Sequence, residues 1–206
     1  MRGKILRSIE DAESALQQLR LPSSLAFIEQ CAFTIAASFQ MGGKVLIAGN
    51  GGSLCDATHF AEELTGIFRQ KRKALPALAL SDPGHLTCVA NDLGFEHVFA
   101  RGVEAYGKPG DVFVGLTTSG KSPNIIRAFE RAKELELTTV AFLGKEGGKL
   151  KGFADLELLI EGFESSDRIQ EAHMTAIHII IELIEEFVFN QSQEVFLEQI
   201  MAAVRR

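Results

Sequence analysis

Residues 44–53, KVLIAGNGGS, place a continuous apolar run directly before a turn that contains three glycines in four residues. An apolar run without alternation is typical of a strand buried on both faces of a parallel sheet. Glycines let the backbone approach a ligand closely, and the first turn of a following helix presents unpaired amide donors. The stretch therefore predicts strand, ligand loop and helix, although a tight turn that only needs positive φ angles is the alternative.

The segments around this stretch alternate between short apolar runs and longer segments with helical periodicity. Alternation of this kind implies parallel strands joined by helical crossovers, which make a doubly wound α/β sheet. The strands expected after the first one, 44–48, are 77–80, 112–116, 139–143 and 156–160. The expected helices are 54–68, 83–90 with 96–106, 124–136 and 167–190, followed by a short terminal helix.

The first 41 residues predict two helices, because apolar residues recur at helical spacing, Pro22 breaks the first run and Gly42-Gly43 ends the second. No internal repeat, low-complexity tract or linker interrupts the sequence. We therefore expect one domain over 1–206, with N-terminal helices over 1–41, an αβα core over 42–190 and a C-terminal helix over 191–206.

The composition predicts a soluble globular protein, since 46% of the 206 residues are hydrophobic and 23% are charged. Lys and Arg number 21 against 27 Asp and Glu, and the net charge of −6 argues against nucleic acid or an anionic membrane as the main partner. No apolar run approaches the roughly 20 residues of a membrane span, and the start lacks a signal-peptide core. Three cysteines without paired spacing suit a reducing cytoplasm.

A second turn, TTSGKSPN over 117–124, follows the apolar run at 112–116. Four hydroxyl side chains surround one glycine, and Pro123 stands where a helix should begin. Hydroxyls and helix-start amides can satisfy phosphate oxygens without a positively charged protein. Open α/β sheets bind ligands at the carboxyl ends of their strands, so two such turns favour a phosphorylated small molecule. The alternative is a polar loop in which Ser122 is only a helix cap.

The helix after the first turn, which Ser53 can cap, carries His59 and Glu63 on one face because they are four residues apart. Imidazole and carboxylate on one face can bind a divalent metal or transfer a proton, although such pairs also occur on ordinary polar surfaces. On the late helix, Gln170 and His178 lie about 80° apart and are a plausible joint pair. Periodicity alone does not bring the two helices together.

Six longer motifs run through nearly the full chain in the order and spacing of one known family: GNGGSLCDATHFAEELTG, ALALSD, NDLGFEHVFARGVEAYGKPGDV, TTSGKSPN, LGKEGGKLKGFAD and DRIQEAHMTAIHIIIELIEE. In these motifs the chain resembles the phosphoheptose isomerases, also called sedoheptulose 7-phosphate isomerases, of the sugar-isomerase (SIS) fold. The resemblance implies an α/β SIS fold with a five-stranded parallel sheet flanked by helices and an N-terminal helical extension. It also implies a cytoplasmic homotetramer with active sites between subunits, in which residues 1–41 serve in oligomerisation.

The implied reaction interconverts sedoheptulose 7-phosphate and D-glycero-D-manno-heptose 7-phosphate through an enediol, the first step toward ADP-heptose or GDP-heptose for the lipopolysaccharide core. The implied catalytic pair is Glu63 and His178. One Zn²⁺ per subunit would be held by His59, Glu63, Gln170 and His178. The implied substrate contacts are Asn50, Gly51, Gly52, Ser53, Glu63, Asn91, Asp92, Thr117, Thr118, Ser119, Ser122 and Gln170.

These residue types suit an aldose–ketose exchange, which needs a base to move a proton between C1 and C2 and a second group to handle the oxygens. Glu63 is the candidate base, provided that burial raises its pKa, and His178 is the partner acid or base. Zinc could polarise the substrate oxygens. A zinc-bound carboxylate is a poorer base, so Glu63 as base, as ligand or as both stays open.

Two positions depart from the family pattern. Thr117 replaces the more frequent Ser and keeps the hydroxyl, whereas Lys121 replaces the usual Asn and adds a cation near the expected phosphate. The alternative function is a non-catalytic SIS adaptor that binds the bacterial replication initiator. That group lacks the counterparts of Glu63 and His178, and both are present here, so the enzyme is favoured.

Overall fold

The structure, a computed structural model, describes residues 1–204 and contains a five-stranded, all-parallel sheet in the order β2-β1-β3-β4-β5. The strands are β1 (Val45–Gly49), β2 (Ala77–Ala79), β3 (Val112–Thr117), β4 (Thr138–Gly144) and β5 (Leu156–Ile160). All five lie within two residues of their predicted ranges. The predicted doubly wound α/β sheet is therefore confirmed.

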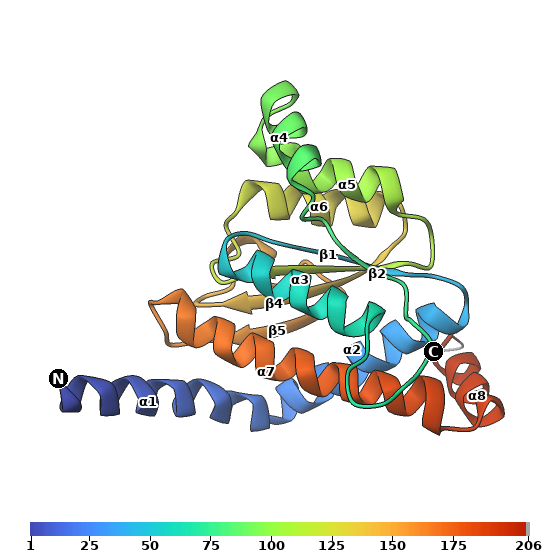
Figure 1. Cartoon of the computed structure of the whole chain (residues 1–206), viewed down its shortest axis with the longest axis horizontal. Helices are drawn as coiled ribbons and strands as arrows, with labels where there is room; N and C mark the ends of the chain where they lie inside the picture. The colour runs from blue at the N-terminus through green and yellow to red at the C-terminus, as the bar shows by residue number, and fades with distance from the viewer. Residues whose placement is uncertain (205–206) are drawn as a thin grey trace.

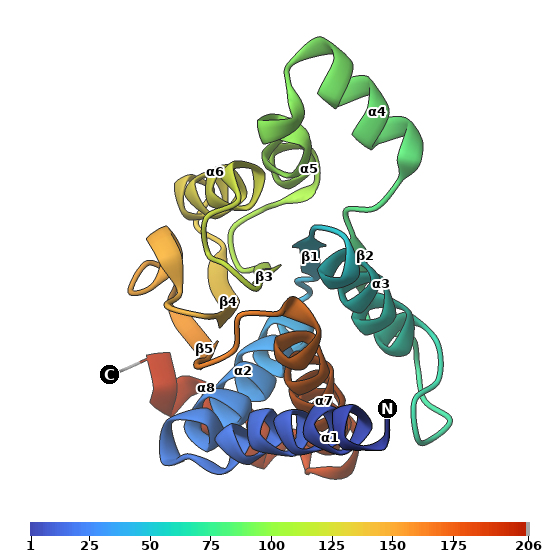
Figure 2. The same ribbon diagram turned by 90° about the vertical axis from the view of Figure 1, so that its left-hand side faces the viewer.

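Helices cover both faces of the sheet (Figures 1 and 2). One face carries α5 (Val98–Tyr106) and α6 (Pro123–Glu134), and the other carries α2 (Pro22–Gln40), α3 (Gly52–Thr65) and α7 (Ser166–Glu185). Outside these layers, α1 (Arg2–Gln17) lies along α7, and α4 (Pro83–Asp92) projects away from the sheet beyond α5 (Figure 2). Short 3₁₀ turns span Gln18–Arg20, Phe95–His97 and Gly148–Leu150.

The central strands are apolar on both sides because their successive residues enter two different cores. On β1, Val45 and Ile47 pack with the layer of α2, α3 and α7, whereas Leu46 and Ala48 pack with α5 and α6. Every residue of β1 is buried. This two-sided burial is the physical reason for the continuous run that the sequence shows at this position.

The strand order creates a switch point between β1 and β3. The chain leaves β1 through α3 to β2 on one side, and β3 pairs with β1 on the other side. In a doubly wound sheet with this order, ligands bind outside the carboxyl ends of the two strands at that point. The two turns that the sequence singled out, after β1 and after β3, both open there.

Several helix boundaries differ from the predictions. The cap of α3 is Gly51, with φ of 56°, rather than Ser53, and the helix begins at Gly52 and ends at Thr65. A Cβ on Gly49 would stand 2.4 Å from the carbonyl oxygen of Ser53, so the turn between them is tight. Ser53 therefore already lies in the first turn of the helix. The predicted helix 96–106 begins as a 3₁₀ turn over Phe95–His97, and the predicted helix 167–190 changes to π geometry over Glu186–Asn190.

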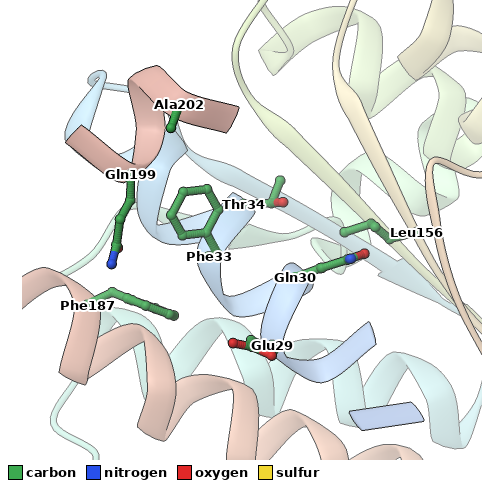
Figure 3. Close-up of a pocket in the computed structure, with 8 residues that line it drawn as sticks. All are labelled: Glu29, Gln30, Phe33, Thr34, Leu156, Phe187, Gln199 and Ala202. Carbon is green, nitrogen blue, oxygen red and sulfur yellow. The ribbon is translucent and has the colours of Figure 1, made fainter. Parts of the chain in front are cut away.

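The last described element, α8 (Gln193–Val204), packs against α2 through Phe196, whose ring centroid lies 5.6 Å from that of Phe33. Beside it, a pocket of 580 Å³ opens between α2, β5 and α8, with Phe33 and Phe187 among its lining residues (Figure 3).

The final two residues of the expected helix 191–206 lie outside the described residues. Within residues 1–204, none of the helices combines the length and the apolar character needed to cross a membrane.

Candidate active site

A pocket of 390 Å³ lies at the switch point, between the turns that follow β1 and β3 and the beginning of α7. We call it the switch-point pocket. Most of the residues predicted to contact the substrate meet in it, although they are up to 120 positions apart in the sequence. Its lining residues are Asn50, Gly52, Ser53, Leu116, Thr117, Thr118, Ser119, Ser122, Ser166 and Gln170.

Three helices begin at this pocket. Gly52 opens α3, Ser122 stands directly before α6, and Ser166 opens α7. The first turn of each helix presents unpaired amide donors at the positive end of the helix dipole. Among residues 1–204, those that line the pocket carry hydroxyl, amide or apolar side chains and no formal charge. The pocket is therefore suited to an anion that is held by dipoles and hydroxyls.

The two turns are tied to each other across the pocket. The Asn50 Nδ2 group donates to the Asn124 Oδ1 atom at 2.9 Å, and the Asn124 Nδ2 group donates back to the Asn50 Oδ1 atom at 2.8 Å. Asn124 is buried, and its Oδ1 atom also accepts from the backbone amide of Ile125 at 3.0 Å. The Asn50 side-chain amide therefore holds the two turns together, and the residue also lines the pocket.

Two hydroxyl groups of the second turn have hydrogen-bond partners close to the pocket. Thr117 accepts at Oγ1 from the Gly120 amide at 3.2 Å, and the Thr118 and Ser166 hydroxyl oxygens lie 2.9 Å apart. Ser122 occupies the cap position of α6, yet its side chain makes no capping hydrogen bond. Ser122 is therefore at the cap position but is not only a cap, because it also lines the pocket.

A second group of functional side chains lies further along α3 and α7. The ligand atoms of His59, Glu63 and His178 all lie within 4.8 Å of one another. The two histidine Nε2 atoms are 3.0 Å apart, and the His59 Nε2 atom is 3.6 Å from the Glu63 Oε1 atom. We call this the His–Glu–His group. The structure thus brings together two helices that periodicity could not connect.

The donor set of this group fits a zinc ion. Imidazole nitrogen and carboxylate oxygen are common zinc ligands with bonds of about 2.0–2.2 Å, so neighbouring ligand atoms of a tetrahedral site lie about 3.3 Å apart. The other ring nitrogen of His59, Nδ1, lies 3.1 Å from the Glu62 Oε1 atom. A carboxylate on the remaining nitrogen is the usual partner that orients a metal-binding histidine. The residues present therefore fit the Zn²⁺ ion that the family resemblance implies.

Gln170 lies in the switch-point pocket. Its Nε2 group donates to the Ser53 Oγ atom at 3.3 Å, and its amide covers Gly52, where a Cβ would come within 2.7 Å. His178 follows eight residues later, about 12 Å further along the α7 axis. To serve as a fourth metal ligand, Gln170 would have to leave Ser53, so its metal role stays a prediction.

Asn91 and Asp92 lie at the end of α4, on the far side of the sheet from α3 and α7 (Figure 2). Both are exposed, and Asn91 Nδ2 donates to Asp92 Oδ1 at 2.7 Å. Lys121 is also exposed and stands outside the set of residues that line the switch-point pocket. The single chain therefore does not bring these three residues to the pocket.

Comparisons with known proteins show the family to which the chain belongs. A family model of the SIS domain matches residues 9–144. The phosphoheptose isomerase of Fusobacterium nucleatum is 58% identical over 164 residues, which cover 80% of this chain and 84% of the relative. That of Vibrio cholerae is 53% identical over 184 residues, which cover 88% and 96% of the two chains. The chain belongs to the phosphoheptose isomerase family.

Solved structures of the family share the whole fold. The phosphoheptose isomerase GmhA of Neisseria gonorrhoeae matches with a TM-score of 0.81 at 34% identity, covering 90% of this chain and 98% of that one. The enzyme of Francisella tularensis matches with a TM-score of 0.84 at 34% identity, covering 89% and 97%. A more distant match, the Vibrio vulnificus NanR protein at 14% identity and a TM-score of 0.65, shows the fold alone.

Two residues that shape the pocket of this phosphoheptose isomerase family member were not predicted from the sequence: Ser166, which lines it, and Asn124, which holds the pocket residue Asn50. Asn124 is the last residue of the turn TTSGKSPN, but its hydrogen bonds to Asn50 span 74 positions and cannot be predicted from the local sequence. Ser166 lies 48 positions from Thr118, and its neighbour Ser165 gives no sign of a contact with the turn after β3. Both positions depend on the sheet topology, which only the folded chain supplies.

A half-buried carboxyl, that of Asp56, lies one helical turn before His59. Burial raises the pKa of Asp56 to about 6, while the nearby His59 acts in the opposite direction. The Asp56 Oδ2 atom is buried and has no hydrogen-bond partner within the described part of the chain. Around pH 6, therefore, this carboxyl gains or loses its proton close to the His–Glu–His group.

Proposed function

We propose that the protein interconverts sedoheptulose 7-phosphate and D-glycero-D-manno-heptose 7-phosphate, the entry to activated heptose for the lipopolysaccharide core. The observation that carries this proposal is the placement of two sites on the same pair of helices. Ser53 and His59 are six residues apart on α3, or about 9 Å, and Gln170 and His178 are about 12 Å apart on α7. An extended phosphosugar is suited to bridge such a distance.

The switch-point pocket binds the phosphate in this proposal. Hydrogen bonds from Thr118, Ser119 and Ser122, with the amides that open α3, α6 and α7, would surround the phosphate oxygens. The absence of a lysine or arginine from the pocket lining of the described chain fits a net charge of −6. Gly51, Gly52 and Ser53 would bring their backbone against the same group, and Thr117 would hold the turn in shape.

The His–Glu–His group performs the proton transfers. Glu63 removes the proton from one of the two carbons C1 and C2 and returns it to the other, and its side chain is only 19% exposed. His178, stacked on the Phe68 ring at 5.8 Å, exchanges a proton with the sugar oxygens through the ring nitrogen that a bound metal would leave free. Stacking fixes the imidazole plane, so the acid and the base stay on the same side of the substrate. An adaptor protein would have no use for such a pair.

Zinc is part of the proposal, with one ion per subunit held by His59, Glu63 and His178 and with Gln170 as a fourth ligand. When bound, the ion would polarise substrate oxygens. Chelation followed by metal analysis tests the requirement. We expect activity to fall more than tenfold in verified metal-free protein and to return with Zn²⁺. Full activity in the metal-free protein would make the ion dispensable.

We also propose a homotetramer with shared active sites in the cytoplasm. On α1, Ile5, Leu6 and Ile9 expose a continuous apolar face, which supports a role for residues 1–41 in oligomerisation. An assembly would also give exposed Asn91 and Asp92 a route to the site of a neighbouring subunit. The three cysteines, all within the described residues, are unpaired, as is usual in a reducing compartment.

A substrate assay tests the proposed reaction directly. Purified protein is offered sedoheptulose 7-phosphate and phosphorylated sugars of five and six carbons at equal concentrations. We expect kcat/KM to be highest for the seven-carbon substrate, because only the longer chain spans the distance between the two sites. A preference for a pentose or hexose phosphate would contradict the proposal.

A further inference from the structure

Arg72 is a buried cation in the segment between α3 and β2. Its side chain is only 2% exposed, and its Nε group donates to the Glu185 Oε1 atom on α7 at 2.7 Å. The Glu185 side chain is 5% exposed. Charged side chains are rarely buried to this extent unless they are paired, so the ion pair is a specific part of the fold.

The same guanidinium binds the end of α3. Its Nη2 group donates to the Glu63 carbonyl oxygen at 2.7 Å, and its Nη1 group donates to those of Leu64 at 2.7 Å and Gly66 at 3.1 Å. The last turn of α3 has no basic residue of its own. Arg72 therefore supplies both the donors and the positive charge that the end of a helix requires.

Both ends of this arrangement lead to the His–Glu–His group. Glu63 is a member of the group, and its own carbonyl oxygen accepts from Arg72. Glu185 follows His178 by seven residues, so it lies on the same side of α7, two turns further on and within about 20°. One planar side chain thus fixes the end of α3 against α7 on the side where the three ligand atoms meet.

We propose that Arg72 is a positioning residue for the His–Glu–His group, acting with Glu185. It holds α3 and α7 at the spacing at which His59 and Glu63 reach His178. The inference rests on the proposed function of that group and adds a residue that touches neither substrate nor metal. A lysine could not replace it, because a single ammonium cannot reach a carboxylate and several carbonyls in a fixed plane.

The chain offers a matched control on the same two elements. The Arg69 Nη1 group and the Glu182 Oε1 atom lie 2.6 Å apart, again between the segment after α3 and α7, but the side chains are 59% and 48% exposed. Exposed pairs contribute little, whereas residues that support metal ligands typically affect metal affinity 10–100-fold. Arg69→Lys therefore repeats the chemical change of Arg72→Lys without the burial.

The experiment measures Zn²⁺ affinity by chelator competition, kcat, KM and Tm for both variants. For Arg72→Lys we expect a loss of at least tenfold in Zn²⁺ affinity and in kcat, with KM for sedoheptulose 7-phosphate changed less than twofold because the switch-point pocket is untouched. For Arg69→Lys all values should stay within twofold of the wild type. A lower Tm for Arg72→Lys with unchanged Zn²⁺ affinity and kcat would overturn the inference.

A double variant separates positioning from stability. Replacing a buried ion pair by apolar residues of similar volume is often neutral for stability, so Arg72→Met with Glu185→Met should fold even if Arg72→Lys does not. We expect it to fold with a lower Tm, because the carbonyls at the end of α3 lose their donors, and to lose Zn²⁺ affinity and kcat at least tenfold when both are measured well below that Tm. Wild-type Zn²⁺ affinity and kcat would overturn the inference. If the wild type itself neither binds Zn²⁺ nor isomerises the substrate, the proposed function fails first. A functional wild type with unaffected variants contradicts this inference alone.

Discussion

The switch-point pocket and the His–Glu–His group lie on the same two helices but are built in different ways. The pocket is made largely of backbone and short side chains from two turns, and it carries no formal charge within the described chain. The His–Glu–His group consists of three long side chains, and His59 and His178 meet across 119 positions. The first should govern binding, because an anion needs only dipoles and hydroxyls, and the second should govern chemistry, because a proton needs a titratable group.

The largest test of this division removes the titratable groups. We expect Glu63→Gln and His178→Gln each to lower kcat by about 10²–10⁴-fold, the typical contribution of positioned acid–base catalysis. Inorganic phosphate should still compete for the pocket with unchanged affinity. Circular dichroism and Tm check that the fold survives, and Glu134→Gln, on the opposite face of the sheet, serves as the control. Full turnover in either variant would refute the catalytic pair.

The second test concerns His173, which lies on α7 between the two sites but faces the core. Burial lowers its pKa to about 4, and its Nε2 atom lies 2.9 Å from the Leu143 carbonyl oxygen. Since the unfolded chain has the higher histidine pKa, it binds the extra proton between about pH 6.5 and pH 4. Stability is therefore full above pH 6.5 and falls by about 3 kcal/mol as the pH drops to 4.

Urea unfolding at pH 7 and pH 4.5 measures this loss, with His173→Leu as the comparison. We expect the variant to lose distinctly less stability between the two pH values, although it is less stable at pH 7 because the Leu143 carbonyl loses its partner. Equal losses in both proteins would show that other groups control the acid response. Because α7 carries residues of both sites, acid should weaken phosphate binding and turnover together.

The third test removes hydroxyls from the switch-point pocket. Thr118→Val and Ser122→Ala each delete a hydrogen bond to a charged phosphate, which typically contributes enough for about a tenfold change in affinity. We expect KM to rise about tenfold while kcat changes less than twofold. Ser165→Ala, an exposed neighbour outside the pocket, is the control. A fall in kcat with constant KM would mean that the switch-point pocket contributes to the chemical step and not only to binding.

The sequence could predict the pocket better than the His–Glu–His group for a physical reason. KVLIA and the turns after β1 and β3 are local patterns, and parallel strands place their carboxyl ends side by side whatever the remaining chain does. The position of Ser122 and the strand ranges follow from such patterns. The contacts between α3 and α7 depend on packing, so only the family resemblance could unite His59 and Glu63 with His178.

The residues whose roles the sequence did not predict also depend on tertiary contacts. Ser53 was expected to cap α3, but the close approach of Gly49 to the Ser53 carbonyl makes the helix begin earlier. Asn124 and Ser166 carry pocket contacts that span the sheet and have no local pattern. Arg72 is one of four basic residues in RQKRK, over 69–73, and only the fold reveals its burial against Glu185. Side-chain roles that depend on burial need the tertiary structure.

The smallest expected effect is at Lys121, and it tests whether the pocket truly works without a cation. The side chain is exposed and outside the pocket lining, although its backbone amide donates to the Ser119 Oγ atom at 3.2 Å. An exposed charge contributes at most about 1 kcal/mol, so Lys121→Asn should raise KM less than about fivefold, and added salt should abolish the difference. The same substitution keeps the amide, so the turn stays intact. A rise well above tenfold that persists at high salt would mean that Lys121 turns onto the phosphate. In that case, binding would depend on a charge as well as on dipoles, and the contrast between the two sites would no longer hold.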